Sequence, residues 1–175
     1  MTLSRKLRVA LLAGILLCTV GCDQTSKHLA RTVLSHERSV ALPGRVVEFQ
    51  LADNPGSFLS VGALLPNPAR FVVFTIGVGV GLTVLAAYLA GCARISARRF
   101  FSLALVLAGG MGNLLDRVLR DGLVTDFAVI RIGPFHTGVF NFADVLIVIG
   151  AGVMAWTFRK GNPSDGRANR LPRTG

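Results

Sequence analysis

The chain has 175 residues, of which 51% are hydrophobic and only 16% are charged. Soluble domains carry about 25% charged residues, so this composition argues against a water-soluble enzyme and favours a membrane protein. The apolar content excludes intrinsic disorder of the whole chain, and three cysteines are too few for a disulfide scaffold. A formal charge of +10 is also found in nucleic-acid-binding proteins, so the placement of that charge along the chain decides between the two classes.

Four stretches are candidates for membrane spans. Residues 71–93 carry no charge and exceed the about 20 residues needed to cross a hydrocarbon layer roughly 30 Å thick. The uncharged runs 9–22, 100–115 and 145–158 are shorter, and they approach spanning length only by including a carboxylate at one end. We therefore predict a membrane all-α fold with four transmembrane helices, at about 8–27, 71–91, 99–117 and 140–159.

The basic residues gather in three segments that four spans place on one side of the membrane. Segments 1–8, 94–99 and 159–175 hold 11 of the 19 basic residues and one of the nine acidic ones, so the whole net charge of +10 lies there. Excess Lys and Arg mark the cytoplasmic side of a membrane protein. We predict that both termini are cytoplasmic and that the positive charge orients the chain in the membrane; no nucleic-acid partner is expected.

The two outer connections, 28–70 and 118–139, contain strand patterns. Residues 46–51 alternate between apolar and polar side chains, and residues 122–132 are followed by a Gly-Pro turn and a further apolar run, which is typical of a hairpin. The sequence therefore predicts a small β element on the outer surface of the membrane.

Residues 1–160 are expected to form one four-helix membrane domain, followed by a disordered cytoplasmic tail over 161–175. The N-terminal segment also imitates a secretory signal, because residues 19–22 (Thr-Val-Gly-Cys) resemble a lipobox. Cleavage there would leave three spans and would put the basic segments on the wrong side. A retained first helix is therefore favoured, and modification of Cys22 stays an open question.

Ionisable residues within spans are functional candidates because burying them in lipid is costly. Asp23, Asp116 and Asp144 each lie 15 to 17 residues from the basic flank of their span. At about 1.5 Å per residue, this places all three about 22–25 Å from the cytoplasmic boundary. Asp126, in the following loop, can fold back to the same level. We therefore expect a polar site in the outer part of the membrane.

Each of the three helical carboxylates has a polar partner about one helical turn away: Asp23 with Lys27, Asn113 with Asp116, and Asn141 with Asp144. No His lies within a predicted span, and no Ser or Cys stands in a nucleophile setting. The spacing of His, Cys and Asp suggests no metal site, so we expect neither metal nor cofactor.

Carboxylate chemistry remains, in which two carboxyls share one proton and activate water. Spacing alone does not choose between Asp116 and Asp126 as a member of the pair. A non-catalytic lipid-binding or assembly protein would use the same polar pocket, and a transporter would need ionisable groups deeper in the membrane.

Five segments in order resemble the lipoprotein signal peptidases (signal peptidase II): residues 23–27 (DQTSK), 54–56 (NPG), 109–117 (GGMGNLLDR), 124–127 (VTDF) and 140–144 (FNFAD). The resemblance covers about 8 to 158 and implies four helices with a small periplasmic β cradle. It implies an aspartyl endopeptidase of the bacterial inner membrane that removes signal peptides from diacylglyceryl-modified prolipoproteins near the periplasmic face. The implied partners are these substrates and membrane lipid, and the chain is expected to act as a monomer.

The resemblance also assigns residue roles. The implied catalytic pair is Asp126 and Asp144. The residues implied to fix this dyad are Asn113, Asp116, Arg117 and Asn141. The residues implied to shape the substrate site are Asp23, Lys27, Asn54 and Gly56. Asn113 and Arg117 lie on either side of Asp116 and favour a permanently charged structural carboxylate at that position. This agrees with the resemblance, which implies that Asp126 is the catalytic residue.

The sequence departs from the family pattern at two places. Thr125 stands where Val is usual, directly before Asp126, and this change is expected to matter little. Gly56-Ser57-Phe58 brings an aromatic ring one position nearer to the glycine than is usual, which affects the expected shape of the lipid or peptide groove.

Overall fold

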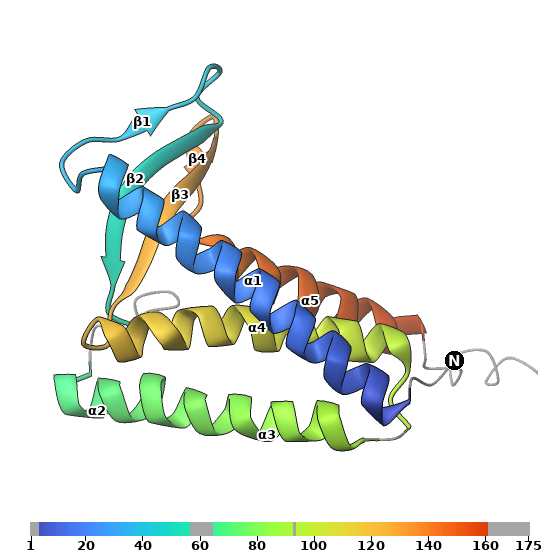
Figure 1. The fold of residues 1–175 in the computed structure, drawn as a ribbon. Coiled ribbons are helices and arrows are strands. Elements are labelled where there is room, and N and C mark those ends of the chain that lie inside the picture. Colours follow the sequence, from blue (N-terminus) through green and yellow to red (C-terminus); the bar gives the residue numbers. More distant parts are fainter. Residues whose placement is uncertain (1–3, 57–64, 93, 161–175) are drawn as a thin grey trace, which may run out of the picture.

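Four long helices cross the length of the molecule, and a four-stranded sheet lies at one end of them (Figure 1). The computed structural model describes residues 4–56, 65–92 and 94–160. The helices are α1 (Arg5–Val33), the continuous run α2 (Asn67–Phe71), η2 (Val72–Gly77) and α3 (Val78–Gly91), then α4 (Ala97–Leu119) and α5 (Phe142–Lys160). All four are long and apolar enough to span a membrane, so the prediction of four membrane helices is confirmed.

The first helix continues six residues beyond its predicted end at residue 27. Its start is capped by Ser4, whose side chain accepts a hydrogen bond from the Leu7 backbone N–H at 3.3 Å. No Gly or Pro interrupts the chain between residues 28 and 42, so nothing breaks the helix where the apolar run stops. The outer connection therefore starts after Val33, and the last turn of α1 stands beside the sheet (Figure 1).

The sheet is antiparallel throughout, in the order β1-β2-β3-β4. Its strands are β1 (Val40–Ala41), β2 (Val47–Asn54), β3 (Val124–Ile132) and β4 (Phe135–His136). The two predicted strand regions are β2 and β3, and β3 with β4 forms the predicted hairpin. Asp126 lies in β3, within the strand pattern predicted over residues 122–132, and this strand pairs with β2 from Val124 onwards.

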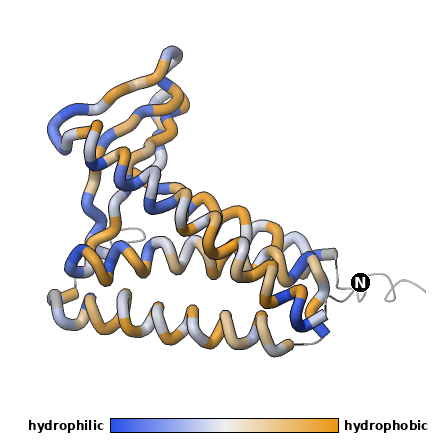
Figure 2. Tube along the Cα trace, in the orientation of Figure 1, coloured by the Kyte–Doolittle hydropathy of each residue, from blue (hydrophilic) through white to orange (hydrophobic). Residues whose placement is uncertain are grey.

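Helix α4 is the central helix of the bundle and packs most closely against α5. Small residues permit this approach: a methyl group at Gly150 would lie 2.6 Å from the Ser102 backbone oxygen, and one at Gly109 would lie 2.7 Å from the Ile147 side chain. Gly112 likewise lets α1 approach, because a methyl group there would lie 2.6 Å from Asp23 Oδ2. Large apolar side chains on the other helices point outward, as Leu17 (78% exposed) and Val84 (65%) do. Large hydrophobic side chains therefore lie on the outside of the helices, where lipid would contact them. Figure 2 shows the apolar residues along the helices.

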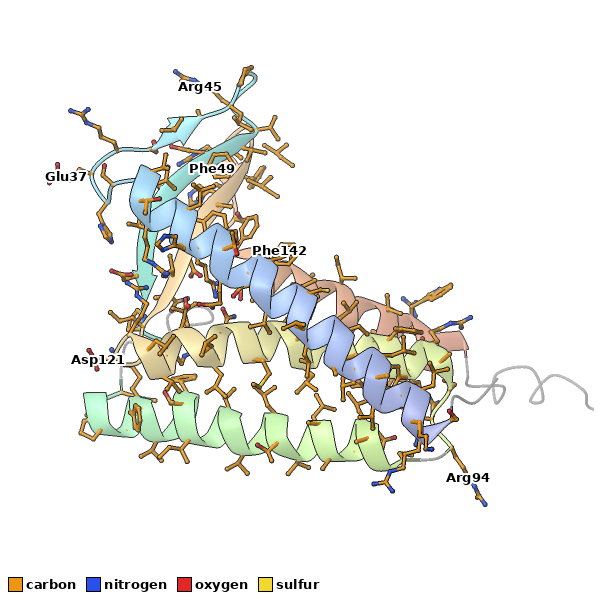
Figure 3. All side chains as sticks on the ribbon, in the orientation of Figure 1. Glu37, Arg45, Phe49, Arg94, Asp121 and Phe142 are labelled. Carbon is orange, nitrogen blue, oxygen red and sulfur yellow. The ribbon has the colours of Figure 1, made fainter. Side chains whose placement is uncertain are left out.

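The two ends of the bundle differ. Arg94, in the link between α3 and α4, lies at the end where α1 begins and α5 finishes (Figure 3). Asp121 and the sheet lie at the opposite end, with Arg45 at the far tip of the sheet. The basic segments of the described chain are thus gathered at one end, as the distribution of charge predicted. The predicted tail and the Ser57-Phe58 departure fall outside the described residues.

Candidate active site

Asp126 is placed by the pairing of β3 with β2. In this register Ala52 lies opposite Asp126, and Asn54 comes two residues later on the same face of the sheet. Asn54 Nδ2 donates a hydrogen bond to Asp126 Oδ2 at 2.9 Å, and its Oδ1 accepts one from the Gly56 backbone N–H at 3.0 Å. Gly56 has φ +111°, a conformation that favours glycine. The tight turn after β2 therefore aims the Asn54 amide at a carboxyl that is only 2% exposed.

Asp144 is placed by the start of α5. The Asn141 backbone N–H donates to Asp144 Oδ2 at 3.1 Å, and the Asp144 backbone N–H donates to Asn141 Oδ1 at 3.0 Å. These reciprocal bonds form a capping box, which fixes both side chains by helix formation itself. Asn141 Nδ2 also donates to Asp126 Oδ1 at 2.6 Å. One asparagine therefore joins the two carboxylates that the sequence proposed as a pair.

Asn113 on α4 links this pair to the interior. Its Nδ2 donates to Asp144 Oδ1 at 2.9 Å, while its Oδ1 accepts from Lys27 Nζ at 2.9 Å and from Asn141 Nδ2 at 3.0 Å. An ammonium can only donate and a carboxylate can only accept, so the two partners fix the orientation of the Asn113 amide.

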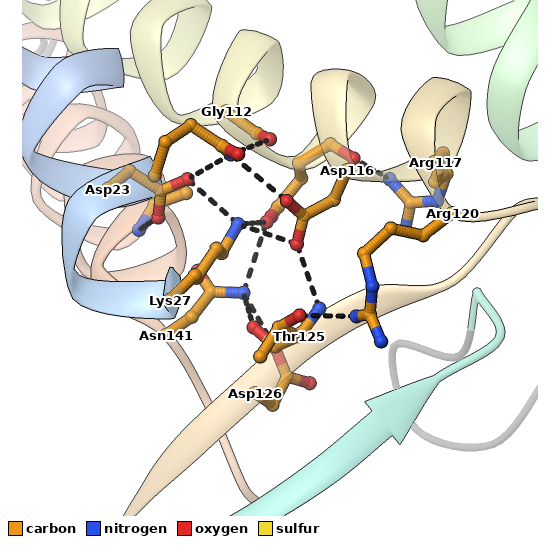
Figure 4. A network of polar contacts seen from close by, with 12 residues as sticks. Asp23, Lys27, Gly112, Asp116, Arg117, Arg120, Thr125, Asp126 and Asn141 are labelled. Carbon is orange, nitrogen blue, oxygen red and sulfur yellow. Dashed lines mark hydrogen bonds and ion pairs between the residues drawn. The ribbon is translucent and has the colours of Figure 1, made fainter. Parts of the chain in front are cut away.

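Lys27 and Asp23 of α1 and Asp116 of α4 form an ionic cluster next to Asn141 (Figure 4). Lys27 Nζ lies 2.8 Å from Asp23 Oδ2 and 3.4 Å from Asp116 Oδ2, and all three side chains are at most 1% exposed. Asp23 Oδ1 accepts from the Ala143 backbone N–H at 3.0 Å, and Asp116 Oδ2 accepts from the Thr125 backbone N–H at 2.9 Å. The cluster therefore holds the residues next to Asp144 and Asp126, and Asp23 and Lys27 face these neighbours rather than open space.

Arg117 follows Asp116 on the side of α4 that faces the pair. Its Nη1 donates to the Asn113 backbone oxygen at 3.5 Å, and its positive charge acts on Asp126, Asp144 and Asp116. Arg117 therefore places a positive charge near the two carboxylates.

Gln24 was noted in its motif but given no role. Its Nε2 donates to Asp116 Oδ1 at 3.0 Å and to the Gly112 backbone oxygen at 3.2 Å. No sequence motif indicates Arg31 and Arg120, and both donate hydrogen bonds to the hydroxyl of Thr125. The position of Gln24 beside Asp23 is a sequence signal for its role. No such signal exists for the two arginines, because only the folded chain brings them to Thr125.

Burial raises the pKa of Asp126 to about 6. The bonds from Asn54 and Asn141 act in the opposite direction, and the charge of Asp144 raises the pKa further. Asp126 therefore keeps its proton to a higher pH than an ordinary Asp. Within the described ranges, no group of three or more His, Cys, Asp and Glu side chains is arranged to hold a metal ion.

Comparisons with known proteins identify the family of this chain. The family model for signal peptidase (SPase) II matches residues 15–160. The lipoprotein signal peptidase of Leifsonia xyli is 33% identical over 93% of this chain and 73% of its own length. That of Moorella thermoacetica is 36% identical over 80% of this chain and 87% of its own length.

The fold is also found among solved structures. Two structures of bacterial membrane enzymes, determined by the in meso method at 2.3 and 1.9 Å resolution, superpose with TM-scores of 0.75 and 0.76. They cover 94% and 88% of this chain and 96% of each of those chains, at 23% and 24% identity. The likeness shows a shared arrangement of helices and sheet. With the family match over residues 15–160, the chain belongs to the signal peptidase II family, peptidase family A8.

Proposed function

We propose that this member of the signal peptidase II family removes signal peptides from diacylglyceryl-modified prolipoproteins with Asp126 and Asp144 as its catalytic pair. One observation carries the assignment of the pair: Asn141 donates hydrogen bonds to both carboxylates, to Asp126 on β3 from its side-chain amide and to Asp144 on α5 from its backbone N–H. The sequence left open a non-catalytic lipid-binding or assembly protein, and membership of a peptidase family favours the enzyme.

The chemistry follows from two carboxyls that share one proton. The ionised member takes a proton from water, and the water oxygen attacks the carbonyl carbon of the scissile peptide bond. The protonated member donates its proton to the carbonyl oxygen, and proton return to the amide nitrogen lets the amine leave. Burial raises the pKa of Asp126 to about 6, so a proton stays on the pair to a higher pH than on an ordinary Asp, and the two carboxyls titrate as a unit.

The remaining site residues orient this pair. Asn113 and Asn141 fix the Asp144 carboxylate by hydrogen bonds from both sides. Asp23 and Lys27, which were expected to shape the substrate site, are 1% and 0% exposed, so we propose that they act on substrate only through the backbone they hold. Asn54 and Gly56 lie beside Asp126 at the end of β2, where a substrate chain would pass.

We further propose that the protein lies in the bacterial inner membrane with both termini in the cytoplasm. The end of the bundle with Arg94 carries the basic segments, which favours the cytoplasmic side for that end. The site and sheet lie at the other end, which is then periplasmic. A precursor anchored by its lipid in the outer leaflet would reach Asp126 and Asp144 there.

A pair of precursor peptides tests this function. Detergent-purified protein is expected to cleave a peptide with a diacylglyceryl-modified Cys directly before that Cys, and to leave the same peptide with an unmodified Cys intact. Mass spectrometry of the products identifies the cleaved bond. Cleavage of neither peptide would favour the non-catalytic alternative, and equal cleavage of both would contradict recognition of the lipid.

The raised pKa of Asp126 predicts a pH dependence. When the pH exceeds the pKa of about 6, the fraction of enzyme with a singly protonated pair falls about tenfold per pH unit, and kcat/KM is expected to fall with it. Asn54→Ala removes a hydrogen bond that favours the ionised carboxylate, so this fall is expected to begin at higher pH. Rates between pH 5 and 8.5 measure both midpoints. An unmoved midpoint in Asn54→Ala would exclude Asp126 as the titrating group.

A further inference from the structure

Thr125 has every polar atom engaged although it is fully buried. Its backbone N–H donates to Asp116 Oδ2 at 2.9 Å, and its backbone oxygen accepts from Asn141 Nδ2 at 3.3 Å. Its hydroxyl oxygen accepts from Arg31 Nη1 at 2.7 Å and from Arg120 Nη1. The residue before Asp126 is therefore held from its backbone and from its side chain at once (Figure 4).

The side chain of Thr125 lies on the face of the sheet opposite Asp126, because successive residues of a strand point to opposite faces. Asp53 of β2 is the cross-strand partner of Thr125, and Arg120 Nη2 lies 2.7 Å from Asp53 Oδ1. Arg120 is the C-cap residue of α4, and Arg31 lies in the last turn of α1. The contacts of one hydroxyl thus tie α1, α4, β2 and β3 together behind Asp126.

The identity of residue 125 is coupled to the two arginines. Valine, the more usual residue here, has the same shape but no acceptor, so it would leave two guanidinium N–H groups without this partner. Arg31 from the end of α1 and Arg120 from the end of α4 both donate to the residue-125 hydroxyl, and Arg120 also pairs with Asp53 through its Nη2. These contacts give the departure from Val at residue 125 a structural role that the sequence pattern does not indicate.

We propose that Thr125 is a positioning residue for peptide cleavage, with its hydroxyl anchored by Arg31 and Arg120 so that β3 presents Asp126 to Asn141. This inference rests on the proposed catalytic role of Asp126. Asp126 Oδ1 lies 2.6 Å from Asn141 Nδ2, and a shift of β3 lengthens this contact directly. Misplacement of a catalytic group by about 1 Å costs up to about a hundredfold in rate, because the reacting geometry is narrow.

Two variants of Thr125 separate positioning from packing. Thr125→Val is expected to lower kcat for the lipidated peptide about tenfold with KM within twofold of the parent. Thr125→Ser keeps the acceptor oxygen and is expected to retain kcat within twofold. Thr32→Val, an exposed threonine next to Arg31, is the matched control and is expected to leave both constants unchanged. Parent-like kcat in Thr125→Val would overturn the proposal.

Arg31→Met removes the same contact without changing β3. It tests whether this contact positions Asp126 even if Thr125→Val does not fold. It is expected to lower kcat several-fold at unchanged KM, and the double variant is expected to lose no more than Thr125→Val alone, because the two residues act as one unit. Additive losses, or an unchanged kcat in Arg31→Met, would show that the contact does not position Asp126. Activity in Asp126→Asn would instead remove the proposed dyad, so the two failures are distinguishable.

Discussion

Asp126→Asn and Asp144→Asn are each expected to lower kcat for the lipidated precursor by at least about a thousandfold while the protein stays folded. Each substitution removes one half of a proton-sharing pair, and a positioned acid or base contributes about 10²–10⁴ in rate. Residues that act as a unit lose their effect together, so the double variant is expected to be no slower than either single variant. Initial rates of peptide cleavage in detergent measure all three.

Retained folding follows from how each carboxyl is buried. The pKa of Asp126 is raised to about 6, so its ionised form opposes folding, and stability falls as pH rises through 6. A neutral amide removes that cost at neutral pH. At residue 144, an amide oxygen still accepts the bond from the Asn141 backbone N–H that closes the capping box, while the amide NH2 loses only the bond from Asn113 Nδ2. Thermal unfolding of both variants is expected within a few degrees of the parent.

Two other aspartates provide controls. Asp121→Asn changes an exposed carboxylate at positive φ, where Asn is well tolerated, and is expected to leave kcat unchanged. Asp116→Asn removes an acceptor that is bonded to Gln24 and Thr125, so a loss of stability is expected. If Asp126→Asn kept full activity and a folded Asp116→Asn lost all of it, Asp116 rather than Asp126 would be the partner of Asp144.

The fold was largely predictable because a membrane restricts it. A hydrocarbon layer admits few charges and requires helices, so the uncharged runs predict where the spans lie. Arg94 and the basic residues near it predict the orientation of the spans across the membrane. The shared depth of Asp23, Asp116 and Asp144 follows from the helical rise alone. Asn113 joins α4 to Asp144 of α5, and Lys27 joins α1 to Asp116 of α4. Both residues lie one helical turn from a carboxylate, which is the signal that the sequence offers for them.

The contacts between distant segments were not predictable from spacing. Asn54 meets Asp126 across 72 positions, and only the β2–β3 register brings them together. Arg31 and Arg120 are ordinary surface-type residues in the sequence until the length of α1 and the path of β3 are known. Periodicity shows which face a residue occupies but not which strand will lie beside it, so the support around Thr125 required the structure.

Lys27→Met is expected to destabilise the protein by about 3–5 kcal/mol and to lower its melting temperature by roughly 10 °C. Lys27 is 0% exposed and lies 2.8 Å from Asp23 and 3.4 Å from Asp116, so its removal leaves two buried carboxylates without their cation. It also leaves Asn113 Oδ1 without the donor that orients its amide toward Asp144. Cleavage by the remaining folded protein is therefore expected to fall as well. Thermal unfolding in detergent gives the stability change.

A second substitution separates charge from packing at this place. Asp23→Asn on the Lys27→Met background removes one of the two unpaired charges, so part of the lost stability is expected to return, although Asp23→Asn alone destabilises the parent. Lys6→Met, on the same helix at an exposed position, is the matched control and is expected to unfold within 2 °C of the parent, as surface charges contribute about 0–1 kcal/mol. If Lys27→Met unfolded at the same temperature as the parent, one of Asp23 and Asp116 would have to be protonated. The two carboxyls would then not need a cation. In that case Asn113 and Asn141, rather than the ionic cluster, would hold the catalytic pair in place.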